Sequence, residues 1–352
     1  MSPCAFVHAV GSGRRKLERM AGGTWTVVDA FAGLGGFGIA AAADERVRRV
    51  VGVEVDGALL KFWKKLTMGE CVQHTIESVG KFPPVLADAR SHLHWSSPCQ
   101  SFSSAKRNGG DPAALSERAN GERLFRLGFQ MVLHHDLSSF SLENVASPPT
   151  LAIAREYKVA HPRVFDFVVL DAVDFGVPTS RRRLIVSSPG SIRRLNERAS
   201  VHRKSMRQAF EERGLPLPAA YVQNSNSNTP PRSIEGAGFC VVAAHAPMWT
   251  GPHGETVRVA SPQESAVLLG FPPNVELPKN KRAAQRAVGN AIPPPLSKAI
   301  LEASLGAAEE PAPIATPALG DESVGFELRV SALERRVAEL EAEREGKRAR
   351  VC

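Results

Sequence analysis

The chain is poor in cysteine, and its cysteines are not grouped. Its 352 residues contain five, none of them spaced as a Cys-x-x-Cys pair: Cys4, Cys71, Cys99, Cys240 and Cys352. Scattered cysteines argue against a disulfide framework and against a cysteine-held metal site. We therefore expect a reducing compartment and no bound metal.

Long apolar runs are also missing. No stretch approaches the roughly 18 apolar residues that a membrane helix needs. The N-terminus lacks the apolar segment of a secretory signal. These absences predict a soluble, intracellular protein that is not secreted and does not contact a membrane.

Positive charge, in contrast, is in excess. The formal net charge is +8 and the isoelectric point is near 9.5. Such a balance favours a polyanionic partner. A generic Arg-rich surface would carry the same charge, so the charge alone does not separate the two interpretations.

Apolar strands alternate with helices through the first half of the chain. The predicted strands are 25–29, 49–54, near 84–88, 92–96 and 138–143, and the predicted helices are about 37–44, 57–66 and 121–135. This alternation predicts an α/β fold with a doubly wound, mostly parallel sheet. Two further strand-like runs, 164–171 and 183–187, are joined by a Gly-Val-Pro turn. They predict that the sheet ends in a hairpin with one antiparallel strand.

The composition changes after Gly190 and divides the chain into domains. Residues 191–232 hold eight Lys or Arg against three Glu, so we expect a small basic domain over 191–278. The larger domain would cover 25–190 and be completed by 279–305. The remaining segments are an N-terminal arm (1–24), a linker (306–325), a short heptad helix (326–346) and a basic tail (347–352). The heptad helix is short, so we expect at most weak self-association through it.

The first chemical motif is a glycine-rich turn between a strand and a helix. It is the run Asp-Ala-Phe-Ala-Gly-Leu-Gly-Gly over 29–36, and Gly33, Gly35 and Gly36 would let a ligand approach the backbone. Glu54 ends the next strand, where a carboxylate can accept hydrogen bonds from a ribose. Asp88, after a third apolar run, could accept from an adenine amino group. The motif predicts an adenosine-containing ligand without a pyrophosphate, although a tight structural turn would also explain the glycines.

The second motif pairs a cysteine with a carboxylate. Cys99, in Pro98-Cys99-Gln100, and Glu143, in Glu143-Asn144-Val145, each follow a predicted strand. Strand ends of a parallel sheet converge, so a thiol and a carboxyl would share one pocket. A single cysteine is more often a small buried apolar residue, and a glutamate at a strand end is often structural.

The third motif is a basic turn that contains Arg181, Arg182 and Arg183. In a strand, Arg181 and Arg183 point to one face and Arg182 to the other. A planar guanidinium can hold a base carbonyl or a phosphate. A solvated basic turn is the plainer interpretation, above all for Arg182.

In this order the motifs resemble those of the DNA cytosine-5 methyltransferases. The resemblance covers about residues 25–303 and rests on six elements: Phe-Ala-Gly-Leu-Gly-Gly (31–36), Pro-Cys-Gln (98–100), Glu-Asn-Val (143–145), Gly-Val-Pro (176–178) with Arg181 and Arg183, Gly-Phe-Pro (270–272) and Gly-Asn-Ala-Ile-Pro-Pro (289–294). It implies a Rossmann-like fold that uses S-adenosyl-L-methionine. It also implies that 191–278 is a target recognition domain.

The resemblance also assigns roles to residues. Cys99 would add to C6 of a cytosine flipped out of duplex DNA, Glu143 would act at N3, and Arg183 would contact O2 with Arg181 close by. The cofactor would be bound by Phe31, Gly33, Gly35, Gly36, Glu54, Asp88, Pro98 and Asn290. With DNA as partner, the compartment would be the nucleus in a eukaryotic host and the cytoplasm otherwise.

Two departures from the family pattern leave alternatives open. Thr179 stands where the family usually has Gln, and Ser96-Ser97 precede Pro98 where a glycine and a second proline are common. One branch of the family acts on transfer RNA, and a homologue with a decayed site would only bind DNA. The plain Pro-Cys-Gln motif and the separate basic domain favour DNA, and the presence of the principal chemical groups argues against decay.

Overall fold

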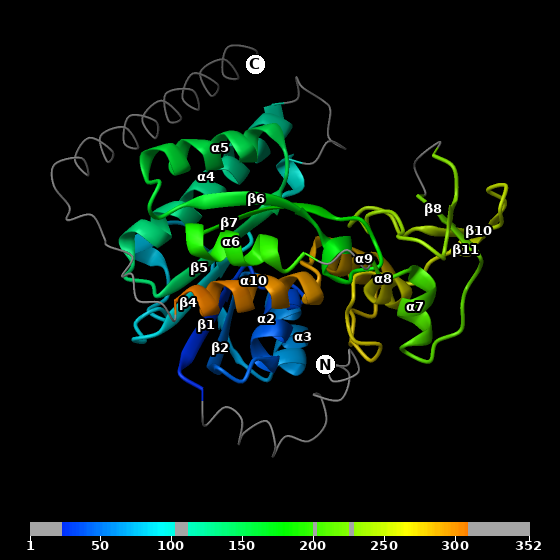
Figure 1. The fold of residues 1–352 in the computed structure, drawn as a ribbon, viewed down its shortest axis with the longest axis horizontal. Helices are drawn as coiled ribbons and strands as arrows, with labels where there is room; N and C mark the ends of the chain where they lie inside the picture. The colour runs from blue at the N-terminus through cyan, green and yellow to red at the C-terminus, as the bar shows by residue number, and fades with distance from the viewer. Residues whose placement is uncertain (1–22, 103–111, 200–202, 225–228, 309–352) are drawn as a thin grey trace, which may run out of the picture. The chain divides into compact units, whose positions relative to one another are not determined.

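The computed structural model describes residues 23–102, 112–199, 203–224 and 229–308. The larger of its two sheets has seven strands in the order β3-β2-β1-β4-β5-β7-β6 (Figure 1). All neighbouring strands are parallel except for β7, which is antiparallel to both β5 and β6. The predicted mostly parallel sheet with one antiparallel strand is confirmed. The strands are β1 (Trp25–Ala30), β2 (Val47–Glu54), β3 (Glu70–Gln73), β4 (Ser91–Trp95), β5 (Ser139–Val145), β6 (Asp166–Asp171) and β7 (Arg182–Ser187).

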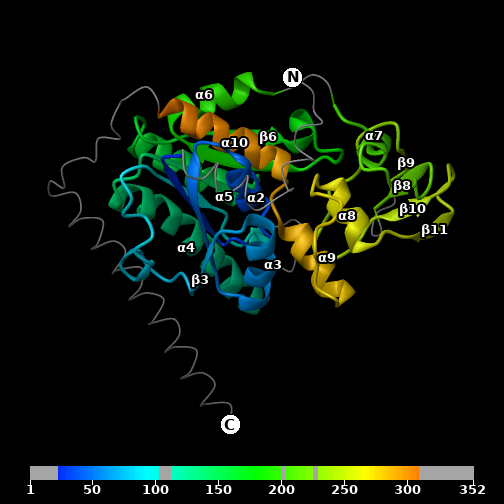
Figure 2. The same ribbon diagram turned by 90° about the horizontal axis from the view of Figure 1, so that it is seen from below.

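Helices cover both faces of this sheet (Figures 1 and 2). Side chains alternate along β4, so Phe37 of the first helix stacks on His94, whereas Trp95 donates from its indole to the Leu124 carbonyl on the opposite face. Buried apolar side chains fill the space under the helices of the Phe37 side. That side has α2 (Gly36–Ala43), α3 (Gly57–Thr67), α6 (Pro189–Glu197) and α10 (Pro294–Ala307), and the other has α4 (Pro112–His134) and α5 (Pro148–Ala160).

The second sheet is small and wholly antiparallel. Its order is β11-β10-β8-β9, and Trp249 at its centre packs edge-on against Phe210. A separate cluster of buried apolar side chains joins the sheet to three short helices. The elements are α7 (Met206–Glu211), β8 (Tyr221–Gln223), β9 (Arg232–Ser233), β10 (Met248–Thr250), β11 (Thr256–Val259), α8 (Pro262–Leu268) and α9 (Lys281–Asn290).

The boundary between the two regions differs from the predicted one. Residue 191, the expected start of the basic domain, lies inside α6, and Ile192 and Leu195 of that helix belong to the core of the large sheet. At the other end, α9 packs with the small-sheet cluster through Ala287 and Val288, and only α10 returns to the large sheet. The spacing of apolar residues on α6 and α9 decides which of the two cores each helix packs into. The average composition of a segment does not show this spacing.

One predicted strand is wrong and one was missed. The apolar run near 84–88 forms no strand, although Val85 and Leu86 are buried. Two prolines at its start, Pro83 and Pro84, lack the backbone N–H that a strand ladder needs. The third parallel strand is instead β3, four residues long and only partly buried.

Some expectations fall outside the described residues. They concern the arm before residue 23, most of the linker, the heptad helix and the basic tail. Within the described ranges, no helix has the length and apolar character to cross a membrane. The same ranges contain no cluster of three His, Cys, Asp or Glu side chains able to hold a metal ion. Short 3-10 turns complete the description: Val79–Lys81, Gln100–Phe102 and Ala172–Phe175.

Candidate active site

The glycine-rich turn links β1 to α2 in a backbone conformation that few residues adopt. Phe31, Gly33 and Gly35 all have positive φ, at 60°, 51° and 97°. The non-glycine Phe31 is the unusual one, and its ring packs edge-on against Trp95 with centroids 5.0 Å apart. A strained residue held in place by its packing is typical of functional turns. The turn therefore has the features expected of a ligand-binding loop.

Gly36 has a packing role instead. A Cβ there would lie 1.8 Å from the carbonyl oxygen of Ile292, so only glycine permits this contact. Gly289 is similar, since a Cβ would lie 2.3 Å from the backbone of Val242 and Ala243. Through these two contacts the 289–292 segment packs against both the glycine-rich turn and the small-sheet region.

Glu54 lies beside the glycine-rich turn, as the sequence predicted. Its Oε2 accepts from the Gly33 N–H at 3.0 Å, and its Oε1 accepts from the N–H groups of Val55 and Asp56 at 2.9 and 3.1 Å. The carboxylate is thus oriented by three backbone donors at the carboxyl end of β2. Each carboxylate oxygen has two lone pairs, so Oε2, which accepts from one N–H group, can still accept from a ligand hydroxyl.

Asp88 does not join this site. It precedes β4, and its carboxylate contacts Thr26 at the start of β1 and the guanidinium of Arg49 at 3.4 Å. These are the amino ends of the strands. At about 3.3 Å per residue, a strand as long as β1 separates that edge from Glu54 by well over 10 Å. Asp88 is on the wrong edge because the run before it is not a strand.

A cavity at the carboxyl edge lies where an adenine partner was expected. Its volume is about 460 Å³, and it opens beside Val55, the residue after Glu54. Gln73 ends β3 directly opposite Glu54. Sequence reasoning missed Gln73 and His74 because β3 is too short to show a pattern. The lining residues are Val55, Gln73, His74, Thr75, Glu77 and Lys81.

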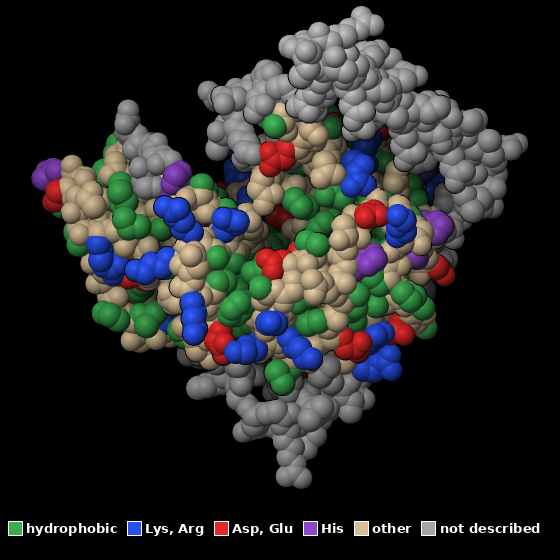
Figure 3. All heavy atoms as spheres, turned by 180° about the vertical axis from the view of Figure 1, so that it is seen from behind, with side chains coloured by type: hydrophobic (Ala, Val, Ile, Leu, Met, Phe, Trp, Pro, Cys, Tyr) green, Lys and Arg blue, Asp and Glu red, His purple; other side chains and the backbone are tan. Residues whose placement is uncertain are grey.

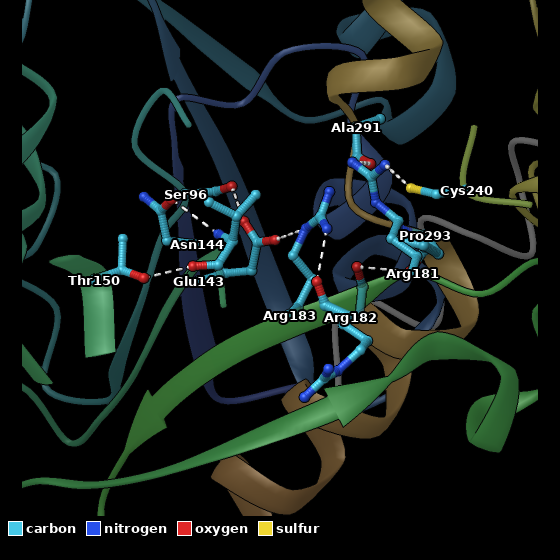
Figure 4. A network of polar contacts seen from close by, with 12 residues as sticks. Ser96, Glu143, Asn144, Thr150, Arg181, Arg182, Arg183, Cys240, Ala291 and Pro293 are labelled. Atoms are coloured by element: carbon cyan, nitrogen blue, oxygen red, sulfur yellow. Dashed lines mark hydrogen bonds and ion pairs between the residues drawn. The ribbon is translucent and has the colours of Figure 1, made fainter. Parts of the chain in front are cut away.

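At the centre of the site, Glu143 is held between two donors (Figure 4). Its Oε1 pairs with Arg183 Nε at 2.8 Å, and its Oε2 accepts from Ser96 Oγ at 2.6 Å. The side chains of Glu143 and Arg183 are each only 8% exposed. β7 is antiparallel, so its first residues lie at the edge where the parallel strands end. The fold thereby brings together a pair that is 40 residues apart in sequence. Ser96 was not predicted as a site residue.

Cys99 follows on the loop after β4. Burial raises the pKa of its thiol, and the positive charge of Arg183 partly opposes this while Glu143 adds to it. The amide of Asn144 holds the loop by donating to the carbonyl and hydroxyl oxygens of Ser97 at 3.3 and 3.2 Å. The thiol, the carboxyl and the guanidinium are therefore close enough to influence one another's charge.

Arg181 has a different role from the one expected. Its buried guanidinium donates to the carbonyls of Val241, Gly289 and Ala291 at 3.0, 3.0 and 2.9 Å. The charge is near the site, but the two terminal nitrogens of the guanidinium join the β7 turn to the small-sheet region and the 289–291 segment. Thr179, at a position where the resemblance implies Gln, adds to this tie through a bond to the Leu268 carbonyl at 2.9 Å.

Pro98 and Asn290 complete the predicted set. Both are exposed, Pro98 directly before Cys99 and Asn290 at the end of α9, beside the contacts made by Gly289 and Ala291. Of the twelve predicted residues, the structure thus brings all but Asp88 to the carboxyl edge or to the segments packed on it.

Comparison with known structures supports the fold. A candidate DNA modification methyltransferase from an E. coli prophage matches with a TM-score of 0.55 and 18% identity, over 81% of this chain and 100% of that one. The Entamoeba histolytica methyltransferase EhMeth gives 0.56 and 15%, over 80% and 97%. The S. pombe Dnmt2 methyltransferase gives 0.52 and 16%, over 78% and 97%. A search of curated proteins found no match.

The sequence itself matches a family model. The model is that of the C-5 cytosine-specific DNA methylases, and it aligns with residues 25–214 and 188–305. These ranges hold both sheets and every described residue of the site. The match covers well over half of the chain, so this protein belongs to the C-5 cytosine-specific DNA methylase family.

Proposed function

We propose that this protein transfers a methyl group to C5 of cytosine in duplex DNA through a covalent bond between Cys99 and C6. The observation that carries the proposal is the buried Glu143–Arg183 pair beside the Cys99 loop. An acid, a fixed cation and a thiol at one strand edge are the groups that such an addition needs.

Cys99 is the nucleophile in this proposal. C5 of cytosine is a poor nucleophile, and addition of a thiolate to C6 converts the ring to an enamine whose C5 is a good one. Burial favours the neutral thiol, so the thiolate becomes available when nearby positive charge stabilises it. Arg183 supplies that charge. Once C5 has taken up the methyl group, loss of the C5 proton to a base expels the Cys99 sulfur and restores the aromatic ring.

Glu143 and Arg183 make the addition feasible. Addition of the thiolate brings negative charge into the ring. Glu143 neutralises this charge by giving a proton, or a strong hydrogen bond, to N3. The Arg183 guanidinium, aligned by its bond to Glu143, contacts the cytosine O2. Both side chains are almost fully buried, so the base must leave the helical stack to reach them, at a cost of roughly a few kcal/mol.

The residues at the other end of the edge fit S-adenosyl-L-methionine. The positive-φ turn is partly exposed at Phe31 and Gly33, and three N–H groups orient the Glu54 carboxylate. The adjoining cavity has room for a base. We propose that Glu54 holds the ribose hydroxyls and that Gln73 and His74 face the adenine. The cofactor supplies an electrophilic methyl group.

The small-sheet region is the proposed DNA-binding part. Figure 3 shows several Lys and Arg side chains over the part of the chain that carries this sheet. Cations positioned along a surface bind phosphates and set orientation, and they carry little base specificity. The region is therefore expected to supply most of the salt-dependent affinity.

Trapping with a fluorinated base tests the proposal. Duplex DNA with 5-fluorocytosine at the target should form an adduct that survives a denaturing gel, because fluorine cannot leave C5 as a cation. Cys99→Ser should give no adduct and lose at least about 1,000-fold in turnover, since a serine hydroxyl is scarcely ionised at neutral pH. An adduct with Cys99→Ser would move the nucleophile elsewhere, to Cys71 or Cys240.

The same assay separates the alternatives. Transfer RNA with 5-fluorocytosine, run beside the DNA, distinguishes an RNA methyltransferase from a DNA methyltransferase. Binding of either nucleic acid without methyl transfer would support a decayed homologue. Adduct on the duplex and none on the transfer RNA is the result that we expect.

A further inference from the structure

Ser96 stands at the junction of three parts of the site. It follows β4, the strand between β1 and β5, and its N–H donates to the Ala30 carbonyl at 3.3 Å. The Ala30 carbonyl lies directly before the glycine-rich turn. From the same position the Ser96 hydroxyl donates to Oε2 of Glu143 at 2.6 Å (Figure 4). The sheet register therefore fixes this hydroxyl against the carboxylate.

The two oxygens of Glu143 are not equivalent. A guanidinium has donors and no acceptor, so Oε1 must remain an acceptor while it pairs with Arg183 Nε. A proton on the carboxyl group is thereby directed to Oε2. Oε2 is the oxygen next to Ser96, whose hydroxyl can donate to it in both protonation states.

We propose that Ser96 is a positioning residue that makes Oε2 the proton-donating oxygen of Glu143 and stabilises the charge left on it. The inference rests on the proposed function of the site. In the step concerned, the Oε2–H bond breaks, the N3–H bond forms, and the O–H electron pair stays on Oε2. The Ser96 hydrogen bond then becomes charge-assisted, and such bonds are roughly twice as strong as neutral ones. It therefore stabilises the transition state more than the ground state.

The charged and titratable groups around Glu143 are Arg183 from β7, Cys99 from the loop after β4, and Arg181, whose charge also reaches the carboxylate. None of them changes when Ser96 is replaced. Loss of the hydroxyl removes a donor that stabilises the charge left on Oε2, so the decline of the reaction rate at high pH should move upward. A purely structural serine would not have this effect.

The experiment measures the single-turnover rate of adduct formation with 5-fluorocytosine duplex across pH, for four proteins. Ser96→Ala should trap about tenfold more slowly, equivalent to about 1.4 kcal/mol, and the decline at high pH should move upward. Ser96→Thr keeps the hydroxyl and should recover most of the rate and the original pH profile. Ser138→Ala, a surface serine that bonds to the Ala89 carbonyl, should behave as the unchanged protein.

The outcomes separate the inference from the proposed function. Absence of any adduct with the unchanged protein would overturn the function itself. A normal adduct with an unshifted pH profile in Ser96→Ala would overturn only the inference, and so would a Ser96→Thr variant as slow as Ser96→Ala. Should Ser96→Ala fail to fold by circular dichroism, Ser96→Thr alone tests the inference, because it must then show the native rate and profile.

Discussion

The two edges of the large sheet carry the same kinds of charged residue and use them differently. At the carboxyl edge, Glu143 and Arg183 form a pair whose side chains are each 8% exposed. At the amino edge, Asp88 and Arg49 form a pair whose side chains are each 32% exposed. Burying an ion pair costs desolvation that the attraction seldom repays. The buried pair is therefore better explained by chemistry than by stability, whereas the solvated pair contributes roughly 0–1 kcal/mol.

The largest contrast is expected for activity. Glu143→Gln should slow methyl transfer by about 100- to 10,000-fold, the usual contribution of a general acid, because an amide has no proton to give to N3. Asp88→Asn is the matched change at the other edge and should leave the rate within about twofold, as expected for a solvated pair. Single-turnover rates of methyl transfer measure both. Equal losses in the two variants would erase the distinction between the edges.

Arg181 should matter for stability more than for chemistry. Arg181→Met removes the guanidinium donors of three buried carbonyls, and we expect the free energy of unfolding to fall by about 3 kcal/mol. Arg183→Met should instead reduce trapping strongly, because it removes the guanidinium that pairs with Glu143. Chemical denaturation and trapping of both variants measure this contrast. A stable but inactive Arg181→Met would show that its charge, and not its bonds to carbonyls, is what the site needs.

The cofactor end of the carboxyl edge gives a smaller effect. Glu54→Ala should weaken S-adenosyl-L-methionine binding by about 10- to 100-fold, since hydrogen bonds to a charged acceptor contribute about 1.5–3 kcal/mol. Asp88→Ala should leave the affinity unchanged, because Asp88 lies at the opposite edge. Calorimetric titration of the two variants tests the pair. Weaker cofactor binding by Asp88→Ala would mean that Asp88 does belong to the cofactor site.

Asp29 supplies a pH-dependent prediction. Complete burial raises the pKa of its carboxyl group from 3.8 to about 7, although Trp63 and the Gly38 N–H donate to it. Between pH 3.8 and about 7, Asp29 is therefore protonated in the folded state and ionised in the unfolded state. The free energy of unfolding is not reduced by this group below about pH 4, and it falls by up to about 1.4 kcal/mol per pH unit from there to about pH 7. Asp29→Asn should make the free energy of unfolding less dependent on pH, which urea denaturation from pH 4 to 8 measures. An unchanged pH dependence in the variant would mean that another group causes it.

The smallest effect is expected at the amino edge. Arg49→Ala removes bonds to Glu70 at 2.8 Å and a contact with Asp88, all of them partly solvated. We expect a loss of less than about 1 kcal/mol, reduced further at high salt. A larger loss of stability, measured by thermal unfolding, would mean that the ion pairs of this edge contribute more than solvent-exposed pairs do.

Local sequence was sufficient to predict the elements whose residues repeat with a regular spacing. The strand–helix alternation, the hairpin with one antiparallel strand and the glycine-rich turn next to Glu54 follow from residue spacing, since the side chains of a strand or helix repeat with a fixed period. The family motifs supplied Cys99, Glu143 and Arg183. These residues lie at strand ends, and in a parallel sheet the carboxyl ends of the strands meet at one edge.

Only the tertiary structure decided which edge each side chain reaches and what it bonds there. Asp88 looked like Glu54 in sequence, yet its apolar run is not a strand, so it faces the amino edge. Arg181 lies directly before β7 and Arg183 lies within it. The guanidinium of Arg181 bonds to the 289–291 segment, whereas that of Arg183 pairs with Glu143. No sequence pattern identified Ser96 as a site residue. Its role depends on register between strands 47 residues apart, and such long-range geometry is not encoded in local periodicity.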